Sequence, residues 1–303
     1  MSNIELIQGE TLEEMQKLID KGVKVDMILC DLPYGTTDCK WDEVIPFEQL
    51  WDKYEKLIKD NGAIVLTASQ PFTSALVMSN PKLFKYEWIW EKSKASNFLQ
   101  AKYMPLKAHE NILVFGKGKV NYYPQKTNGK PFNKGKDKRK GKATEVYAEI
   151  PNINGFEIKN EKGLRNPRTV QYFKTAESEG KHHPTQKPTW LFEYLIKTYT
   201  QKGETVLDNT LGSGTTALAC LNTERNCIGI ELEEKYLQVA KKRVEKNKRK
   251  RLEARNFDAA RNLGINYIPC CMGEAEQLPQ DKFCKVCNLP TDGEKCYSKR
   301  CPI

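Results

Sequence analysis

A short apolar run that ends in an acidic turn is the feature that most constrains the fold of this 303-residue chain. Residues 25–29 have the length and apolar character of a buried strand, and the turn Asp31-Leu32-Pro33-Tyr34-Gly35 ends it. Ligands of open α/β sheets bind where such strands end. Asp31 supplies a hydrogen-bond acceptor and Tyr34 a flat face, so the turn suits a planar substrate with an exocyclic amino group. A strand-ending turn with an aspartate cap is the simpler alternative.

Apolar periodicity on both sides of this turn predicts alternating strands and helices. We expect strands at residues 4–8, 25–31, 63–67, 86–90, 111–115, 206–208 and 227–231, and helices at residues 11–19, 47–58, 71–78, 190–199, 217–221 and 236–244. Thr11 and Glu14 form a predicted capping box, and Asn61-Gly62 a predicted helix end. This order is typical of an α/β protein with a parallel sheet.

Composition favours a cytoplasmic protein with a polyanionic partner. No stretch reaches the roughly 18 apolar residues of a membrane helix, and the N-terminus lacks the form of a signal peptide. The net charge is +10, with ten Lys or Arg and one acid between Lys117 and Lys142, and a second basic run at residues 241–251. Two basic clusters favour nucleic acid. Residues 116–180 show little periodicity, which favours an inserted recognition region.

A glycine loop follows the predicted strand at residues 206–208. Gly212 and Gly214 leave room for a ligand against the backbone, and the next helix begins directly after them. Glu231 ends the following strand, where it can accept hydrogen bonds from ribose hydroxyls. A dinucleotide would normally require a third glycine at position 217, which is alanine, and Asp208 would repel its pyrophosphate. The positive charges of S-adenosylmethionine suit Asp208 better.

Taken together, these motifs resemble those of the amino-group DNA methyltransferases of the β arrangement, in which the catalytic half precedes the cofactor half. Asp31-Leu32-Pro33-Tyr34 is similar to their D-P-P-Y motif, with leucine in place of the first proline. Residues 208–216 resemble their cofactor loop, and residues 183–188 the segment before it. Gly9-Glu10 matches a position that is usually Gly-Asp.

The resemblance implies a Rossmann-like seven-stranded S-adenosylmethionine-dependent methyltransferase fold that is circularly permuted in sequence. It implies a catalytic half at residues 1–116, an inserted target-recognition region at 117–180 and a cofactor-binding half at 181–250. A small cysteine-rich module would occupy residues 264–303.

The same resemblance assigns site residues. Asp31, Leu32, Pro33 and Tyr34 would form the catalytic motif. Lys187 and Pro188 would close over the methionine part of the cofactor, Glu231 would hold the ribose, and Glu10 would lie near the adenine amino group. The methionine part would contact the glycine loop through Asp208, Gly212, Gly214 and Thr215.

The implied activity is site-specific transfer of a methyl group from S-adenosylmethionine to the N6 amino group of adenine in double-stranded DNA, by direct attack on a flipped-out base. N4-cytosine methylation uses the same geometry and stays an alternative, although serine often replaces the Asp31 equivalent there. Another is a DNA-binding protein on an inactive methyltransferase scaffold. An oxidoreductase is the weakest alternative. Cytosine-C5 methylation is excluded, because the only Pro-Cys pair, Pro269-Cys270, lies in the tail. The resemblance leaves open a homodimer and a cognate restriction enzyme of a restriction-modification pair.

Six of the ten cysteines lie in the last 34 residues. In a reducing compartment such clustering favours metal over disulfides. Cys284, Cys287, Cys296 and Cys301 have the spacing C-x2-C-x8-C-x4-C, which predicts one structural zinc site. Cys270 and Cys271 are an alternative ligand pair, and reduced thiols without metal are the simpler interpretation.

Overall fold

The computed structural model describes residues 2–35, 42–136, 157–180 and 185–262. The predicted cysteine-rich module and the first residues of the 183–188 segment lie outside this range. The chain divides into two compact units, residues 1–241 and 242–303. The predicted catalytic and cofactor-binding halves therefore share one unit up to residue 241, and the fold below is that of this first unit.

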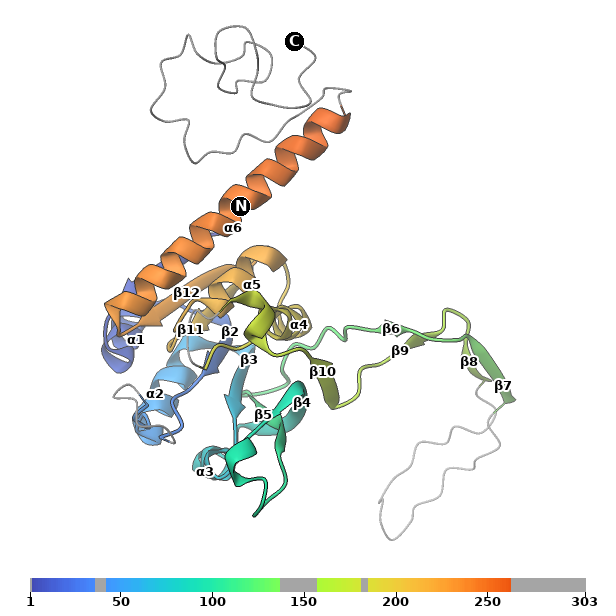
Figure 1. The fold of residues 1–303 in the computed structure, drawn as a ribbon, viewed down its shortest axis with the longest axis horizontal. Helices are drawn as coiled ribbons and strands as arrows, with labels where there is room; N and C mark the ends of the chain where they lie inside the picture. Colours follow the sequence, from blue (N-terminus) through green and yellow to red (C-terminus); the bar gives the residue numbers. More distant parts are fainter. Residues whose placement is uncertain (1, 36–41, 137–156, 181–184, 263–303) are drawn as a thin grey trace, which may run out of the picture. The chain divides into compact units, whose positions relative to one another are not determined.

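A mixed sheet forms the centre of the first unit (Figure 1). In spatial order, the strands found in the described residues are β1 (Ile4–Gln8), β12 (Asn226–Glu231), β11 (Thr205–Asp208), β2 (Val25–Asp31), β3 (Ile58–Ala68), β5 (Lys107–Phe115), β4 (Phe84–Ser96) and β10 (Val170–Phe173). The pairs β1–β12, β12–β11, β11–β2 and β2–β3 are parallel. Strand β5 runs antiparallel to both β3 and β4. The α/β class is confirmed.

The order of strands in space differs from their order in the chain. Although β1 and β2 follow one another in sequence, β12 and β11 lie between them. Ile4 pairs with Cys227 on one side of this insertion, and Leu207 pairs with Ile28 on the other. The strand ends that carry Asp31 and Asp208 thereby become neighbours.

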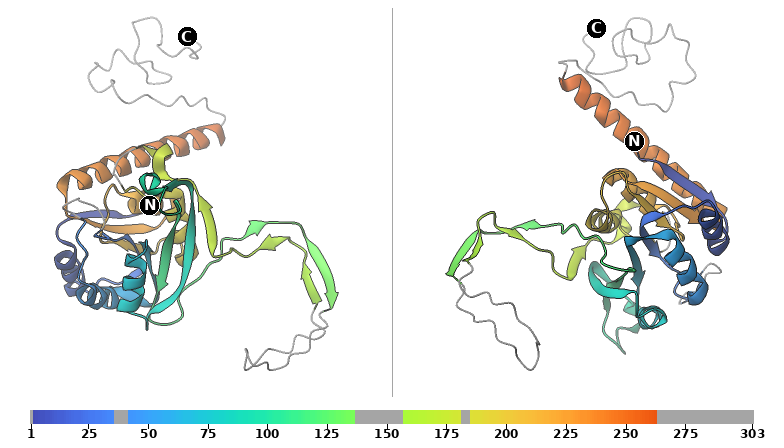
Figure 2. Two further views of the ribbon diagram at one scale, coloured as in Figure 1. Left: turned by 60° about the horizontal axis from the view of Figure 1, so that its bottom comes forward. Right: turned by 180° about the vertical axis from the view of Figure 1, so that it is seen from behind.

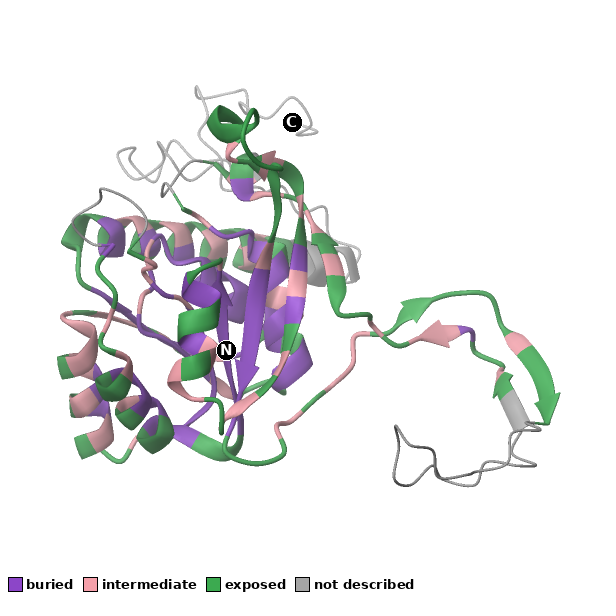
Figure 3. Ribbon diagram, turned by 90° about the horizontal axis from the view of Figure 1, so that it is seen from below, coloured by how far each residue is buried: buried purple, intermediate pink, exposed green. Residues whose placement is uncertain are grey.

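Helices cover both faces of the sheet (Figure 1). The helices are α1 (Thr11–Asp20), α2 (Phe47–Leu57), α3 (Phe72–Ser79), α4 (Thr189–Tyr199), α5 (Thr215–Thr223) and α6 (Glu234–Asn262). Helices α1, α2 and α3 bury Met15, Tyr54 and Leu76 in one cluster with Ile28 and Leu66 of the sheet. Helices α4 and α5 pack together, and α4 also contacts β2. The central strands of the sheet are largely buried (Figure 3), and β2 is buried over almost its whole length, as its apolar sequence requires.

Several local predictions differ from the structure. Helix α1 begins after Glu10, whose carboxylate accepts a hydrogen bond from Glu13 N at 2.8 Å, so the predicted Thr11–Glu14 capping box is wrong. Helix α2 ends at Leu57, and Asn61-Gly62 lies inside β3 instead of capping the helix. The sheet of the described residues has eight strands and not seven, because Val170–Phe173 adds β10 beside the edge strand β4.

The predicted inserted region at 117–180 contains both an attached and a separate part. Strand β10 pairs with β4, and Tyr123 N donates to Thr198 O of α4 at 2.7 Å, so one end of the region joins the main sheet and the other packs on α4. Its middle forms two short antiparallel pairs, β6 (Thr127–Asn128) with β9 (Leu164–Arg165) and β7 (Phe132–Lys136) with β8 (Glu157–Asn160), as Figure 2 shows.

Across the described ranges, no helix combines the length and the apolar character needed to cross a bilayer.

Candidate active site

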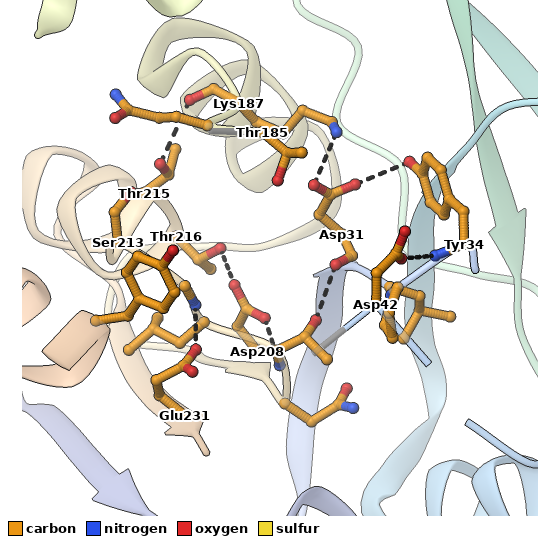
Figure 4. Close-up of a pocket in the computed structure, with 18 of the residues that line it drawn as sticks. Asp31, Tyr34, Asp42, Thr185, Lys187, Asp208, Ser213, Thr215, Thr216 and Glu231 are labelled. Carbon is orange, nitrogen blue, oxygen red and sulfur yellow. Dashed lines mark hydrogen bonds and ion pairs between the residues drawn. The ribbon is translucent and has the colours of Figure 1, made fainter. Parts of the chain in front are cut away.

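A cavity of about 970 Å³ opens at the edge of the sheet where β2 and β11 end. It brings together most residues that the sequence assigns to the catalytic and cofactor sites (Figure 4). Those lining it are Glu10, Asp31, Leu32, Pro33, Tyr34, Lys187, Asp208, Gly212, Thr215 and Glu231. Segments far apart in the sequence thus form one site, as the predicted parallel strands require.

Asp31 is the most heavily hydrogen-bonded of these residues. Its Oδ2 accepts a hydrogen bond from Lys187 Nζ at 2.7 Å. Its Oδ1 accepts from the Tyr34 hydroxyl at 2.8 Å and also from Thr67 Oγ1. A carboxylate offers about four lone-pair directions. Three donors therefore orient the group firmly and leave acceptor capacity for one more, the number that a single amino N–H needs.

Tyr34 has a role that the sequence did not indicate. Its ring stacks on Phe72 with centroids 5.0 Å apart, and its hydroxyl also donates to Thr67 Oγ1 at 3.2 Å. Burial and the nearby Asp31 raise the pKa of Tyr34 well above its ordinary value, so the hydroxyl stays protonated and donates. Asp42 accepts from the backbone N–H groups of Tyr34 and Gly35 at 2.8 and 3.0 Å, which fixes the turn.

Lys187 joins the two halves of the site differently from the prediction. Its side chain points to Asp31 (Figure 4), while its carbonyl accepts a hydrogen bond from Thr215 Oγ1 at 3.4 Å. Glu110 of β5 pairs with two lysines: its Oε2 lies 3.4 Å from Lys187 Nζ, and its Oε1 lies 3.4 Å from Lys92 Nζ. Burial lowers the pKa of Lys187, but Asp31 and Glu110 outweigh it and raise that pKa well above its ordinary value. The ammonium stays charged and ties the catalytic turn to β5.

Asp208 is buried at the start of the glycine loop, with 3% of its surface exposed. Burial raises its pKa to about 7, although hydrogen bonds from Thr216 Oγ1 and Thr210 N favour the ionised form. A cationic ligand close to this carboxyl group would favour its ionised form and be attracted by the negative charge. The Asp208 carboxylate therefore suits a positively charged cofactor.

Glu231 and Glu10 both line the cavity. Glu231 accepts from Gly212 N at 2.7 Å and from Glu233 N at 2.9 Å. Burial raises its pKa, and these two N–H groups oppose that shift. Glu10 uses one carboxylate oxygen as the cap of α1. Both carboxylates are thus held by backbone donors in the cavity wall.

Two assigned cofactor residues are absent from the residues that line the cavity. Pro188 is buried and precedes α4 directly. Gly214 has a φ of +84°, and a Cβ there would lie 2.7 Å from the Cβ of Ala240 in α6. Gly214 therefore permits close packing of the loop against α6, and the structure gives it no contact with the cavity.

Several residues of the site escaped the sequence analysis. Lys92, Glu110, Thr67 and Asp42 surround the catalytic turn but belong to β4, β5, β3 and a loop. For Thr67, Lys92 and Glu110 the one available signal was their place at or next to the ends of predicted strands, and Asp42 had no such signal. In the described part of the chain, no group of three or more His, Cys, Asp or Glu side chains could hold a metal. The four cysteines predicted to bind zinc lie outside that part.

One protein-family model matches the part of the chain that contains most of these site residues. The family model described as DNA methylase matches residues 25–242, a span that contains the catalytic turn, Lys187 and the glycine loop. The chain belongs to the DNA methylase family. The resemblance drawn from the motifs is thereby confirmed, and the choice between N6 and N4 chemistry is not made by it.

Individual members of the DNA methylase family match over most of the chain. The type II methyltransferase M2.MboI of Moraxella bovis is 28% identical over 267 residues, covering 80% of this chain and 87% of its own. The crystal structure of the M1.HpyAVI–SAM complex has a TM-score of 0.58 and 26% identity, covering 80% of this chain and 98% of that one. The PvuII DNA methyltransferase, named as cytosine-N4-specific, has a TM-score of 0.51 at 15% identity, covering 79% of this chain and 86% of that one, and shares the fold.

Proposed function

We propose that this chain is a site-specific DNA methyltransferase that transfers a methyl group from S-adenosylmethionine to the N6 amino group of adenine. The observation that carries the proposal is the Asp31 carboxylate, held by Tyr34, Thr67 and Lys187 in the same cavity as Asp208 and Glu231. The cavity thus presents an oriented acceptor together with acids suited to a cation.

The residues of the glycine loop fit the cofactor. Asp208, whose pKa of about 7 reflects burial, would gain from a ligand ammonium or sulfonium charge. Glu231 and Glu10 offer carboxylate oxygens to ribose hydroxyls and to an adenine amino group. The chemistry that the cofactor supplies when bound is a methyl group made electrophilic by its sulfonium. The relative M1.HpyAVI, solved as a SAM complex, supports this choice.

The catalytic turn would activate the target amino group. An adenine N6 lone pair is delocalised into the ring and is a weak nucleophile. Acceptance of an N–H by Asp31, and of the other by the Leu32 carbonyl, favours tetrahedral geometry at nitrogen and returns the lone pair to it. The three donors fix Asp31 before the base arrives, so the site supplies preorganised electrostatics and positioning. Inside a duplex the base cannot reach Asp31, and it must leave the stack.

Residues 117–180 would carry target recognition. The described part of this region exposes Lys126, Lys130, Lys134 and Lys136. Replacing these four lysines with alanine should weaken binding to every duplex and reduce the dependence of log Kd on log salt. An unchanged salt slope would move the DNA surface elsewhere. We also propose domain boundaries at residues 116, 180 and 250. The chain would be circularly permuted relative to the usual strand order, and the position of β11 and β12 between β1 and β2 supports this.

The deciding experiment identifies the product. Mixed-sequence duplex DNA is incubated with the protein and S-adenosylmethionine, and the digested nucleosides are separated by mass spectrometry. We expect N6-methyladenine, with at least about a hundredfold less formed per unit time by Asp31→Ala. Detection of N4-methylcytosine instead would mean that the same mechanism acts on cytosine, the base given in the name of the PvuII enzyme. Cofactor binding without any methylated nucleoside would favour an inactive scaffold.

A further inference from the structure

The loop that joins β4 to β5 exposes an unusual number of large apolar side chains. Residues 98–106 are all exposed. The apolar side chains are Phe98, Leu99, Tyr103, Met104 and Leu106. Leu99 and Tyr103 are the most exposed, at 82% and 85%. Such clusters on a protein surface mark sites of interaction.

Local hydrogen bonds shape this loop. Asn97 adopts a left-handed conformation with a φ of 71°, and its amide donates to Gln100 Oε1 and to Met104 Sδ, both at 3.2 Å. Backbone N–H groups of Tyr103 and Met104 donate to Gln100 O at 2.9 and 3.1 Å. The apolar side chains therefore project from a folded turn that its own backbone stabilises, while the core contributes little.

The loop lies beside the cavity. Strand β5 is antiparallel to both β3 and β4, so β4 ends at the same edge of the sheet as β2. Phe98, Ser96 and Lys94 belong to the cavity lining. The exposed loop is therefore continuous with the wall of the site in which Asp31 lies. Figure 3 shows the exposed turn at the end of the strands.

The charge of the loop favours a nucleic-acid partner. Residues 94–107 contain three lysines and no acid. Lys94 pairs with Glu177 at 3.1 Å, whereas Lys102 and Lys107 are exposed on either side of Tyr103. Lysines suit phosphates and apolar side chains suit base faces. A second copy of the chain could also cover apolar side chains, but it would not account for the lysines or for the position beside the cavity in which Asp31 lies.

We propose that the β4–β5 loop enters the duplex at the target base pair, and that Leu99 and Tyr103 fill the space left by the flipped nucleotide. The inference rests on the proposed function and extends it to the step that delivers the base. A flipped base loses its stacking, and its neighbours lose a partner. Apolar side chains inserted between base pairs replace part of that contact and stabilise the opened duplex.

The test compares two duplexes that carry the methylated site found by product analysis. In one the target adenine is paired, and in the other it faces a mismatched base and leaves the stack readily. Leu99→Ala and Tyr103→Ala are each compared with Met78→Ala, a control of similar exposure, 72%, on α3. We expect each loop variant to lose about tenfold in methylation of the paired duplex, the scale of one lost stacking contact. The mismatched duplex should be methylated nearly as well as by the unchanged protein.

A second readout follows the base itself. With 2-aminopurine at the target position, its fluorescence increase on protein binding should shrink in the loop variants and persist in Met78→Ala. Equal losses on both duplexes, or no loss on either, would overturn the inference. A loss of dimers in sedimentation together with equal losses would assign the loop to contacts between copies instead. Absence of any methylated nucleoside in the product analysis of the unchanged protein would refute the proposed function, a result distinct from failure of the loop variants alone.

Discussion

Lys187 Nζ lies 2.7 Å from Asp31 Oδ2, although 156 positions separate the two residues in the chain. The pair connects the segment before α4 to the end of β2. Because Thr215, which follows Gly214, donates to the Lys187 carbonyl, a single residue touches both the proposed catalytic carboxylate and the proposed cofactor loop. The two functional halves are therefore in direct physical contact through one side chain and its own backbone.

Asp31→Ala should separate catalysis from cofactor binding. The methyl-transfer rate should fall about 10²–10³-fold or more, because the lost acceptor acts as nitrogen rehybridises. The Kd for S-adenosylmethionine, measured by isothermal titration, should change little. Asp26→Ala is the matched control: Asp26 is a buried acid on the same strand, paired with Lys59 at 2.6 Å, and is not among the cavity residues. It should affect stability and spare single-turnover methylation by the folded protein. Near-normal turnover of Asp31→Ala would contradict the proposed role.

Tyr34→Phe should reduce the methyl-transfer rate by about tenfold, the scale of a hydrogen bond to a charged group. The hydroxyl donates to Asp31, while the ring stacks on Phe72, so phenylalanine keeps the packing and removes one donor. Tyr34→Ala should cause a larger loss in the same single-turnover assay. Equal losses in the two variants would show that the hydroxyl alone matters, and no loss in Tyr34→Phe would show that it does not.

The sequence predicted those parts of the fold that are encoded locally. The strand at 4–8 matches β1, and the predicted catalytic strand ends at Asp31 as in β2. Each of these strands could be recognised from its own apolar run, without knowledge of the strands that pair with it. Lys92 and Glu110 were missed, because their contact with Lys187 depends on which strands become neighbours in the sheet. Asn61-Gly62 has the composition of a helix end but lies within β3, at the irregularity between Ile58, which pairs with Val25, and Ala63, which pairs with Met27.

Cofactor affinity should depend on pH through Asp208. Its pKa is raised to about 7, mainly by burial. A cationic ligand prefers the ionised form, so the affinity for S-adenosylmethionine should rise between about pH 6 and pH 8 and level off above. Asp208→Asn should bind more weakly and flatten this profile, as measured by isothermal titration across that range. A wild-type profile without a step near pH 7 would argue against the assignment.

The same shift predicts the sign of a stability effect. Between about pH 4 and pH 7 the folded protein keeps a proton on Asp208 that the unfolded chain releases, so this group's contribution to the free energy of unfolding falls as pH rises. Asp208→Asn should remove that part of the pH dependence in urea titrations without cofactor.

Gly214→Ala should destabilise the protein more than Gly203→Ala. Both glycines have a positive φ, +84° and +83°, so each alanine carries strain of about 1–2 kcal/mol. A Cβ at Gly214 would also lie 2.7 Å from Ala240, whereas nothing lies within 4 Å at Gly203. Urea unfolding should therefore rank Gly214→Ala as the less stable variant. Equal effects would mean that the contact with α6 relaxes freely.

The cysteine-rich module should contain one zinc ion per chain. Cys284, Cys287, Cys296 and Cys301 provide four thiolates with suitable spacing. Elemental analysis of protein purified without added metal should find about one equivalent, and replacing Cys284 and Cys287 with serine should remove it. A content well below one zinc per chain in the unchanged protein would leave these residues as reduced thiols.

The placement of β11 and β12 between β1 and β2 affects how the protein is made. On the ribosome, β1 and β2 emerge early, yet in the finished sheet they stand three strand spacings apart, about 14 Å. Neither can bond to the other, and among the strands of this sheet in the described residues the two that lie between them are translated last. The facing edges of β1 and β2 therefore stay unpaired until Glu231 has left the exit tunnel. Because Asp208 and Glu231 arrive with those strands, a nascent chain has no complete cavity before that point, and methyl transfer must follow it.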